Sequence, residues 1–170
     1  MSTVRVLLAV VAILSASCGS SAPTAPTTQI AGVWNGWTVV TAVSGGECVG
    51  DLNQFPIGSK TPITVAIAQI DSAVTAVVTA QTTGVNCSFA GTVDGSNFAL
   101  SASGCSVAVT GNIRCANGAA RDMLFLAQSF SGTVSGATLT GTAADSYNIT
   151  DIFRGSLGTL VINKTFALSR

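Results

Sequence analysis

The five cysteines are the residues of this chain best suited to covalent chemistry. Thiols of exported proteins usually pair as disulfides, so an odd count leaves one cysteine for a different reaction. Cys18 stands alone near the N-terminus. No cysteine lies in a Cys-x-x-Cys pair and the chain has no histidine, so the commonest general base and the commonest zinc ligand are missing. We therefore expect no cofactor and no metal site, and we expect disulfides among the remaining four, Cys48, Cys87, Cys105 and Cys115.

The segment before Cys18 has the pattern of an export signal. Arg5 supplies a positive charge, residues 6–14 are uninterruptedly apolar, and small residues at 15–17 precede the thiol. Nine apolar residues are too few to cross a hydrocarbon core, which takes roughly 20 residues. We therefore expect a cleaved signal rather than a permanent membrane helix.

This pattern resembles the lipobox of a bacterial lipoprotein, with residues 1–17 as the signal peptide. The resemblance implies that Cys18 is lipidated and becomes the mature N-terminus. The exported protein would then be anchored in the bacterial cell envelope, at the periplasmic or surface face of the outer membrane. The alternative is ordinary signal cleavage near Ala22, which also exports the protein. Residues 18–29, rich in Ser, Thr and Pro, follow as a tether that spans roughly 30 Å when extended.

The composition indicates a single all-β domain over residues 30–170. Charged residues make up 8% of the chain, whereas Val, Thr, Ile, Gly and Ser dominate, which favours strands and turns over helices. Removal of Arg5 with the signal leaves six of the seven basic residues against seven acidic ones. Such a near-neutral domain has no basic field with which to recruit nucleic acid.

Period-two alternation and turn residues predict eight strands in up-and-down order. Tight turns are expected at Asp71-Ser72, Gly95-Ser96 and Ser135-Gly136, all at one end of the sheet. The longer connections, 44–60, 104–120 and 148–156, then fall at the opposite end, the mouth. Because eight strands leave the last antiparallel to the first, we expect a closed antiparallel β-barrel. The predicted strands are 31–43, 61–70, 73–82, 86–94, 97–103, 121–134, 137–147 and 157–169.

The same topology places four cysteines at the mouth. Pairing Val93 with Phe98 across the turn sets Cys87 opposite Gly104, one step from Cys105, and a bulge at the strand end brings the two cysteines within reach. We therefore favour the disulfide Cys87–Cys105, which leaves Cys48–Cys115 as the second. Four cysteines allow three connectivities, so the other pairings stay open.

The start of the first predicted strand, Ala31-Gly32-Val33-Trp34, looks like the Gly-x-Trp element that opens the barrels of lipocalins and avidins. The whole chain resembles small bacterial lipoproteins with a lipocalin-like barrel, most of them uncharacterised. This resemblance implies that Gly32 and Trp34 lie at the base of the barrel, where Arg170 covers the indole.

The predicted mouth carries most of the charged residues. Either they form a polar rim that recognises a ligand or they solvate long loops, and the sequence leaves both interpretations open. The rim residues are Glu47, Asp51, Arg114, Arg121, Asp122, Asp145 and Arg154. The apolar side chains expected inside are Ile63, Val65, Ile67, Val74, Val78, Phe89, Val93, Phe98, Leu100, Leu124, Leu126 and Phe130.

Binding is the function that these features favour. We expect no enzyme, because the chain shows no set of residues for nucleophilic catalysis. The favoured function is a membrane-anchored binding module that holds a small, apolar ligand in the barrel mouth. The alternatives are a structural or protein-interaction lipoprotein of the envelope with a barrel filled by side chains, and an inhibitor of an exported protease.

Overall fold

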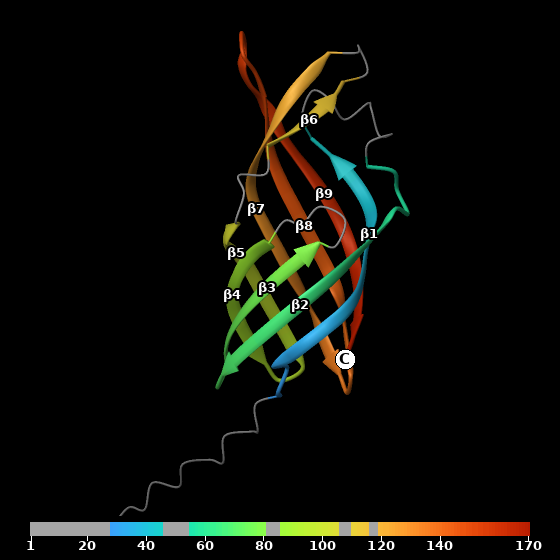
Figure 1. Cartoon of the computed structure of the whole chain (residues 1–170), viewed down its shortest axis with the longest axis vertical. Helices are drawn as coiled ribbons and strands as arrows, with labels where there is room; N and C mark the ends of the chain where they lie inside the picture. Colours follow the sequence, from blue (N-terminus) through green and yellow to red (C-terminus); the bar gives the residue numbers. More distant parts are fainter. Residues whose placement is uncertain (1–27, 46–54, 81–85, 106–109, 116–118) are drawn as a thin grey trace, which may run out of the picture.

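All regular secondary structure in the described part of the chain is β-strand. The computed structural model describes residues 28–45, 55–80, 86–105, 110–115 and 119–170, with only the backbone described at 86, 103–105 and 110–113. Cys18, Glu47, Cys48 and Asp51 therefore lie outside the described residues. Figure 1 shows the strands, which are β1 (Gly32–Ser44), β2 (Lys60–Ile70), β3 (Ala73–Ala80), β4 (Asn86–Asp94), β5 (Asn97–Cys105), β6 (Thr110–Arg114), β7 (Ala120–Ser135), β8 (Thr138–Asp151) and β9 (Gly155–Ser169).

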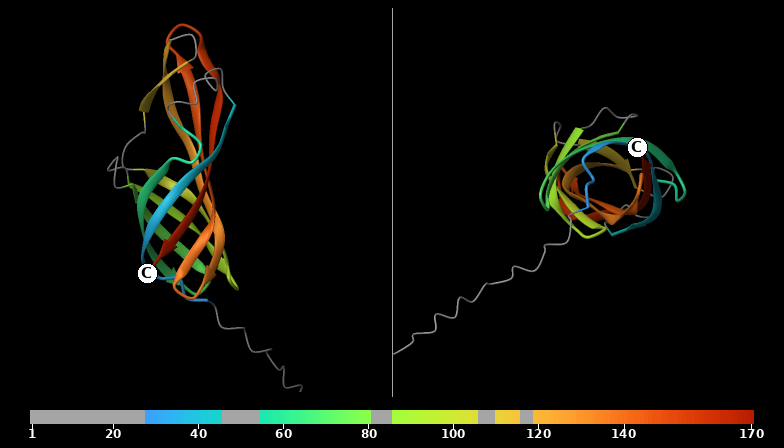
Figure 2. Two further views of the ribbon diagram at one scale, coloured as in Figure 1. Left: turned by 90° about the vertical axis from the view of Figure 1, so that its right-hand side faces the viewer. Right: turned by 90° about the horizontal axis from the view of Figure 1, so that it is seen from below.

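Eight of these strands form one antiparallel ring. Their order around the sheet is β5-β4-β3-β2-β1-β9-β8-β7, and a further pairing of β5 with β7 joins the two ends. The view from below in Figure 2 shows this ring. The predicted all-β architecture of eight antiparallel strands is confirmed, but the ring does not close evenly, because β5 and β7 pair only between Asn97–Ser101 and Ser129–Thr133.

Three tight turns and the C-terminus lie at one end of the ring, which we call the base (Figure 1). The turns contain Asp71, Gly95 and Gly136, whose φ angles of 54°, 55° and 58° are all positive. Glycine adopts positive φ without steric cost, and aspartate tolerates it better than most residues. The three turns predicted from the sequence are thus found between β2 and β3, β4 and β5, and β7 and β8.

The opposite end differs from the prediction because three strands continue past the ring. β8 and β9 remain paired up to Asp151 and Gly155, where the sequence predicts a loop over 148–156. Inside the predicted loop 104–120, β6 pairs with the first residues of β7. The extension has an apolar face of its own, since Ile149 and Leu160 are 0% and 1% exposed there. We call β6 and the parts of β7, β8 and β9 beyond the ring the extension; it lies at the top of Figure 1.

Apolar side chains form two clusters that follow one another from the base to the extension. The lower cluster includes Trp34, Phe89, Phe130 and Phe166, and the Phe89 and Phe130 ring centroids lie 5.3 Å apart, edge to face. Burial of such side chains is the main favourable term in folding. The upper cluster consists of Val40, Cys115, Met123, Ile149, Leu160 and Ile162.

A β-bulge in β7 corrects the predicted interior. Phe125 and Ala127 pair with consecutive residues of β8, so Leu126 is an extra residue in the strand. Strict alternation from Phe130 predicts that Leu126 and Leu124 point inward, but they are 51% and 44% exposed because the bulge changes the face beyond it. The other ten residues of the predicted interior are buried.

Candidate ligand-binding cavity

Trp34 closes the base of the ring. Its indole is fully buried, and its Nε1 donates a hydrogen bond of 2.8 Å to the Ile30 carbonyl. The Arg170 guanidinium lies over the indole, with its Cζ 4.6 Å from the ring centroid, and its Nη1 donates a 3.0 Å hydrogen bond to the Ala31 carbonyl. Gly32 has a φ of 136°, which favours glycine. The structure thus brings Gly32, Trp34 and Arg170 together.

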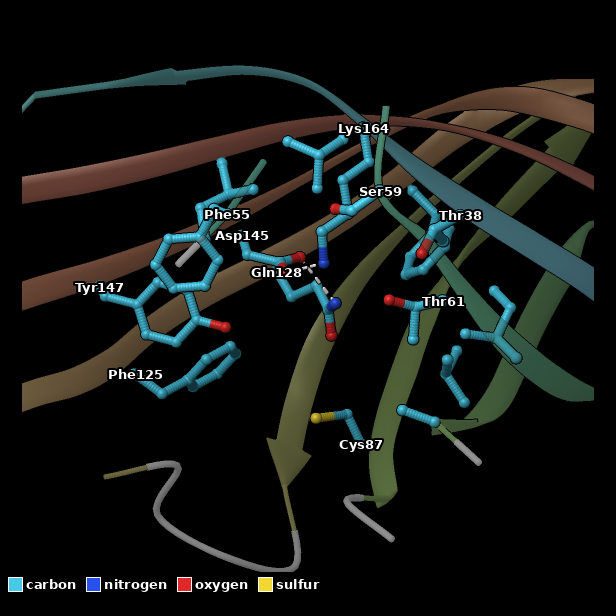
Figure 3. A pocket seen from close by; sticks show the side chains of 16 residues that line it. Thr38, Phe55, Ser59, Thr61, Cys87, Phe125, Gln128, Asp145, Tyr147 and Lys164 are labelled. Carbon is cyan, nitrogen blue, oxygen red and sulfur yellow. Dashed lines mark hydrogen bonds and ion pairs between the residues drawn. The ribbon is translucent and has the colours of Figure 1, made fainter. Parts of the chain in front are cut away.

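A cavity of about 340 Å³ lies inside the ring (Figure 3). Its walls include Ile63, Val78 and Phe130 of the lower cluster together with Val40 and Ile162 of the upper cluster. The cavity therefore lies between the two clusters, with packed side chains on both sides of it.

One wall of the cavity carries a buried ion pair. Asp145 on β8 is 3% exposed, and its Oδ2 pairs with the Lys164 ammonium on β9. Gln128 on β7 donates a hydrogen bond of 2.7 Å from its Nε2 to the Asp145 Oδ1. Figure 3 shows these three side chains converging from neighbouring strands. A buried carboxylate needs both a cation and hydrogen bonds, and this arrangement supplies both.

Aromatic side chains continue this wall. The rings of Tyr147 and Phe125 meet edge to face with centroids 6.0 Å apart, and Phe55 lies beside them in Figure 3. Burial raises the pKa of the Tyr147 hydroxyl, and the nearby Asp145 charge raises it further. The hydroxyl therefore stays protonated at neutral pH and can donate a hydrogen bond.

The facing wall is mostly apolar. It is built by β2, β3 and β4, which supply Ile63, Val78, Ala80 and Cys87, with the hydroxyl of Thr61 among them. The cavity consequently has a polar side on β7 to β9 and an apolar side across from it. Such a site can hold a molecule that has both characters.

Of the predicted rim residues, Asp145 alone lines the cavity among those that the structure describes. Arg121 instead forms a 3.1 Å ion pair with Asp151 in the extension. Asp151 also accepts hydrogen bonds from the backbone N–H groups of Phe153 and Arg154, and the first of these is the main reason why the pKa of the Asp151 carboxyl is lowered. The residues that are exposed and outside the cavity lining are Arg114, Asp122 and Arg154.

The register of β4 and β5 sets Cys87 opposite Cys105. The pairing shifts between Ser88 and Phe89, as the predicted bulge requires. Cys87 is buried beside the cavity, and Cys115 is buried in the upper cluster. The disulfides Cys87–Cys105 and Cys48–Cys115 stay predictions.

Gln128, Tyr147 and Lys164 are cavity residues that the sequence reasoning misses. Gln128 stands two positions before Phe130, and Lys164 stands two positions before Phe166, so each shares the inner face of its strand with a buried aromatic residue. A polar side chain at an inward position is the signal by which they could have been found. Such a polar side chain can be recognised as part of a site only when the ring places β7, β8 and β9 side by side.

Comparison with known proteins identifies no family for this chain. No protein-family model matches the chain, and no curated protein or solved structure matches it. Within the described residues, no helix is long and apolar enough to cross a membrane. Nor does this part of the chain gather three or more His, Cys, Asp or Glu side chains where they could hold a metal ion.

Proposed function

We propose that this protein is an exported, lipid-anchored binding protein that holds a small, mostly apolar molecule in the cavity of its ring. The observation that carries the proposal is the cavity of about 340 Å³ between two packed clusters. Sites for small molecules typically enclose about 300 to 1,000 Å³ and combine apolar walls with a few placed polar groups. The cavity has these properties.

The packing around the cavity supports a site that exists before the ligand binds. Trp34 and Phe89 are buried below it, and Ile149 and Leu160 are buried above it. Because the side chains of both clusters are buried against one another, binding would require little ordering of the protein, which favours affinity. A barrel filled by side chains, the first alternative, would leave less room than this cavity offers.

We propose a role in binding rather than in catalysis, without a cofactor. The charged groups described in the cavity, Asp145 and Lys164, are engaged with each other, which suits holding a ligand better than transferring a proton. The chain also lacks histidine, the commonest general base.

The anchor belongs to the same proposal. Cys18 carries the lipid, and residues 18–29 connect it to the base, where β1 begins close to Arg170. The base would then face the membrane, and the cavity and the extension would face away from it.

Native mass spectrometry of the protein purified from its own host tests the proposal. We expect an added mass on the wild type that disappears in Ala80→Phe, because Ala80 lines the cavity and the larger side chain fills it. The control is Ala66→Phe, since Ala66 is exposed on the neighbouring strand and should leave the added mass in place. A wild-type protein without added mass contradicts the proposal, as does a mass that Ala80→Phe retains.

A protein-interaction role in the envelope is the second candidate, and the tip of the β8–β9 hairpin favours it. Ile152 and Phe153 are 82% and 90% exposed there, which is unusual for adjacent large apolar side chains. A photo-crosslinking residue at position 153 should then capture an envelope protein in host cells, and one at the exposed position 140 should not. Equal yields from both positions would exclude this candidate. The described residues give no support to an inhibitor of an exported protease.

A further inference from the structure

The charges in the cavity cancel. Asp145 and Lys164 are the charged side chains among its described lining residues, and they pair with each other. A charged ligand would enter without a counter-ion of its own. Separating Lys164 from Asp145 to provide one would leave a buried carboxylate unpaired, which is strongly unfavourable. The cavity is therefore matched to an uncharged molecule.

Hydrogen-bonding groups nonetheless remain available in it. The Nε2 of Gln128 is committed to Asp145, but no described residue donates a hydrogen bond to its Oε1. The Tyr147 hydroxyl likewise has no partner among the described residues, and neither oxygen is sealed off by surrounding atoms. Lys164 has two ammonium hydrogens besides the one directed at Asp145. In Figure 3 these groups face the middle of the cavity.

The apolar surroundings suit a flat ring. Phe55, Phe125 and Tyr147 gather on one side of the cavity (Figure 3), and Ile63 and Val78 line it from β2 and β3. Aromatic side chains pack favourably against other rings in offset or edge-on geometry.

We propose that the cavity recognises an uncharged, ring-containing molecule that carries a hydroxyl group. This inference rests on the proposed binding function and deepens it by naming the class of ligand. The hydroxyl donates a hydrogen bond to the Gln128 Oε1 and accepts one from Tyr147 or Lys164, while the ring packs between the aromatic side chains and the apolar wall. A hydroxyl fits because it donates and accepts at once.

Three probes of one shape test the inference. The mature protein is titrated at pH 7 with naphthalene, 2-naphthol and 2-naphthoate. We expect 2-naphthol to bind about tenfold more tightly than naphthalene, which is the effect of a well-placed buried hydrogen bond. We expect 2-naphthoate to bind about tenfold more weakly than 2-naphthol or worse, because Asp145 already balances the charge of Lys164.

Two variants assign the effect to residues. Gln128→Leu and Tyr147→Phe should each reduce the preference for 2-naphthol over naphthalene toward onefold, and Thr140→Val, an exposed site on β8, should keep it. Because the naphthalene titration reports whether the cavity is intact, a variant that merely unfolds loses both probes and is recognised as such. If Gln128→Leu fails to fold, Tyr147→Phe, which keeps the ring and removes only the hydroxyl, should still bind naphthalene and lose the preference.

The outcomes separate the two proposals. Equal affinities for naphthalene and 2-naphthol, or tightest binding of 2-naphthoate, overturn the inference but leave the proposed binding function standing. A tenfold preference that persists in both variants overturns the assignment to Gln128 and Tyr147. If the wild type binds none of the three probes, the proposed function itself fails.

Discussion

Asp145 combines a charged carboxylate with almost complete burial, a combination that costs several kcal/mol unless the charge is paired and hydrogen-bonded. Lys164 and Gln128 provide those partners at the wall of the cavity. A buried pair of this kind adds little net stability compared with an apolar pair, but breaking it is expensive. Its value to the protein therefore lies in the polar surface that it gives the cavity.

Lys164→Met should lower the free energy of unfolding by about 3–5 kcal/mol, because Asp145 then stays buried without a cation. The double variant Asp145→Leu/Lys164→Met removes both charges and should recover most of that loss. Urea unfolding followed by tryptophan fluorescence measures both values. A double variant as unstable as Lys164→Met alone would show that packing rather than charge is responsible.

Trp34→Ala should lower the free energy of unfolding by about 3–5 kcal/mol, because it opens a hole among fully buried side chains at the base. Asp122→Ala is the control, since Asp122 is exposed and its loss should stay within about 0.5 kcal/mol. Thermal melts compare the two. If Trp34→Ala melts at the same temperature as the wild type, the indole does not hold the base together.

Among the strands, β7 is the one that belongs both to the ring and to the extension. Its lower part pairs with β5 and its upper part with β6, and the bulge at Leu126 lies between the two. A bulge bends and twists a strand, which lets one strand take part in both arrangements. The inward Phe125 and Gln128 flank this bend and line the cavity.

Deletion of Leu126 should be tolerated at a cost of about 1–2 kcal/mol, because Phe125 and Ala127 already pair with consecutive residues and keep their faces. Deletion of Leu124 should cost more, since it turns Met123 from the upper cluster toward solvent. Urea unfolding of the two deletion variants provides the comparison. The reverse order of stability would mean that the bulge itself is required for folding.

Alternation predicts the ring strands well because each has one buried face, as Ile63, Val65 and Ile67 of β2 illustrate. It misses β6, a short strand whose pairing depends on the extension, and it assigns Leu124 to the wrong face because it cannot anticipate a bulge. The cavity is harder to predict from the sequence than the strands are. Gln128 is an ordinary polar residue in the sequence and becomes part of a site only where β8 brings Asp145 beside it.

The two predicted disulfides concern the molecule as a whole: one joins Cys87 and Cys105 on the neighbouring strands β4 and β5, and the other starts from Cys115 in the upper cluster. Peptide mapping without reduction should recover Cys87 linked to Cys105, which face each other across β4 and β5, and Cys48 linked to Cys115. Each link closes a long loop and should contribute about 3–4 kcal/mol. Recovery of alkylated Cys87 from unreduced protein would rule out the first link.

Anchoring also concerns the whole molecule. Radiolabelled palmitate should enter the wild type and not Cys18→Ser, because the lipobox-like pattern directs acylation to that thiol. Thr140→Ser is a suitable control, since an exposed side chain on β8 should not affect labelling. Label in Cys18→Ser, or none in the wild type, would refute the lipid anchor.

The hydrogen bond from Arg170 to the Ala31 carbonyl brings the two ends of the folded domain together at the base. The protein should therefore tolerate circular permutation. A short linker can join Arg170 to Ile30, and new chain ends can be opened at the exposed turn after Ser135. The cavity lies far from the new linker and the new chain ends and should keep its shape. The proposed membrane anchor and the proposed ligand site are therefore separable, and the point of tethering can be moved around the base without changing the cavity.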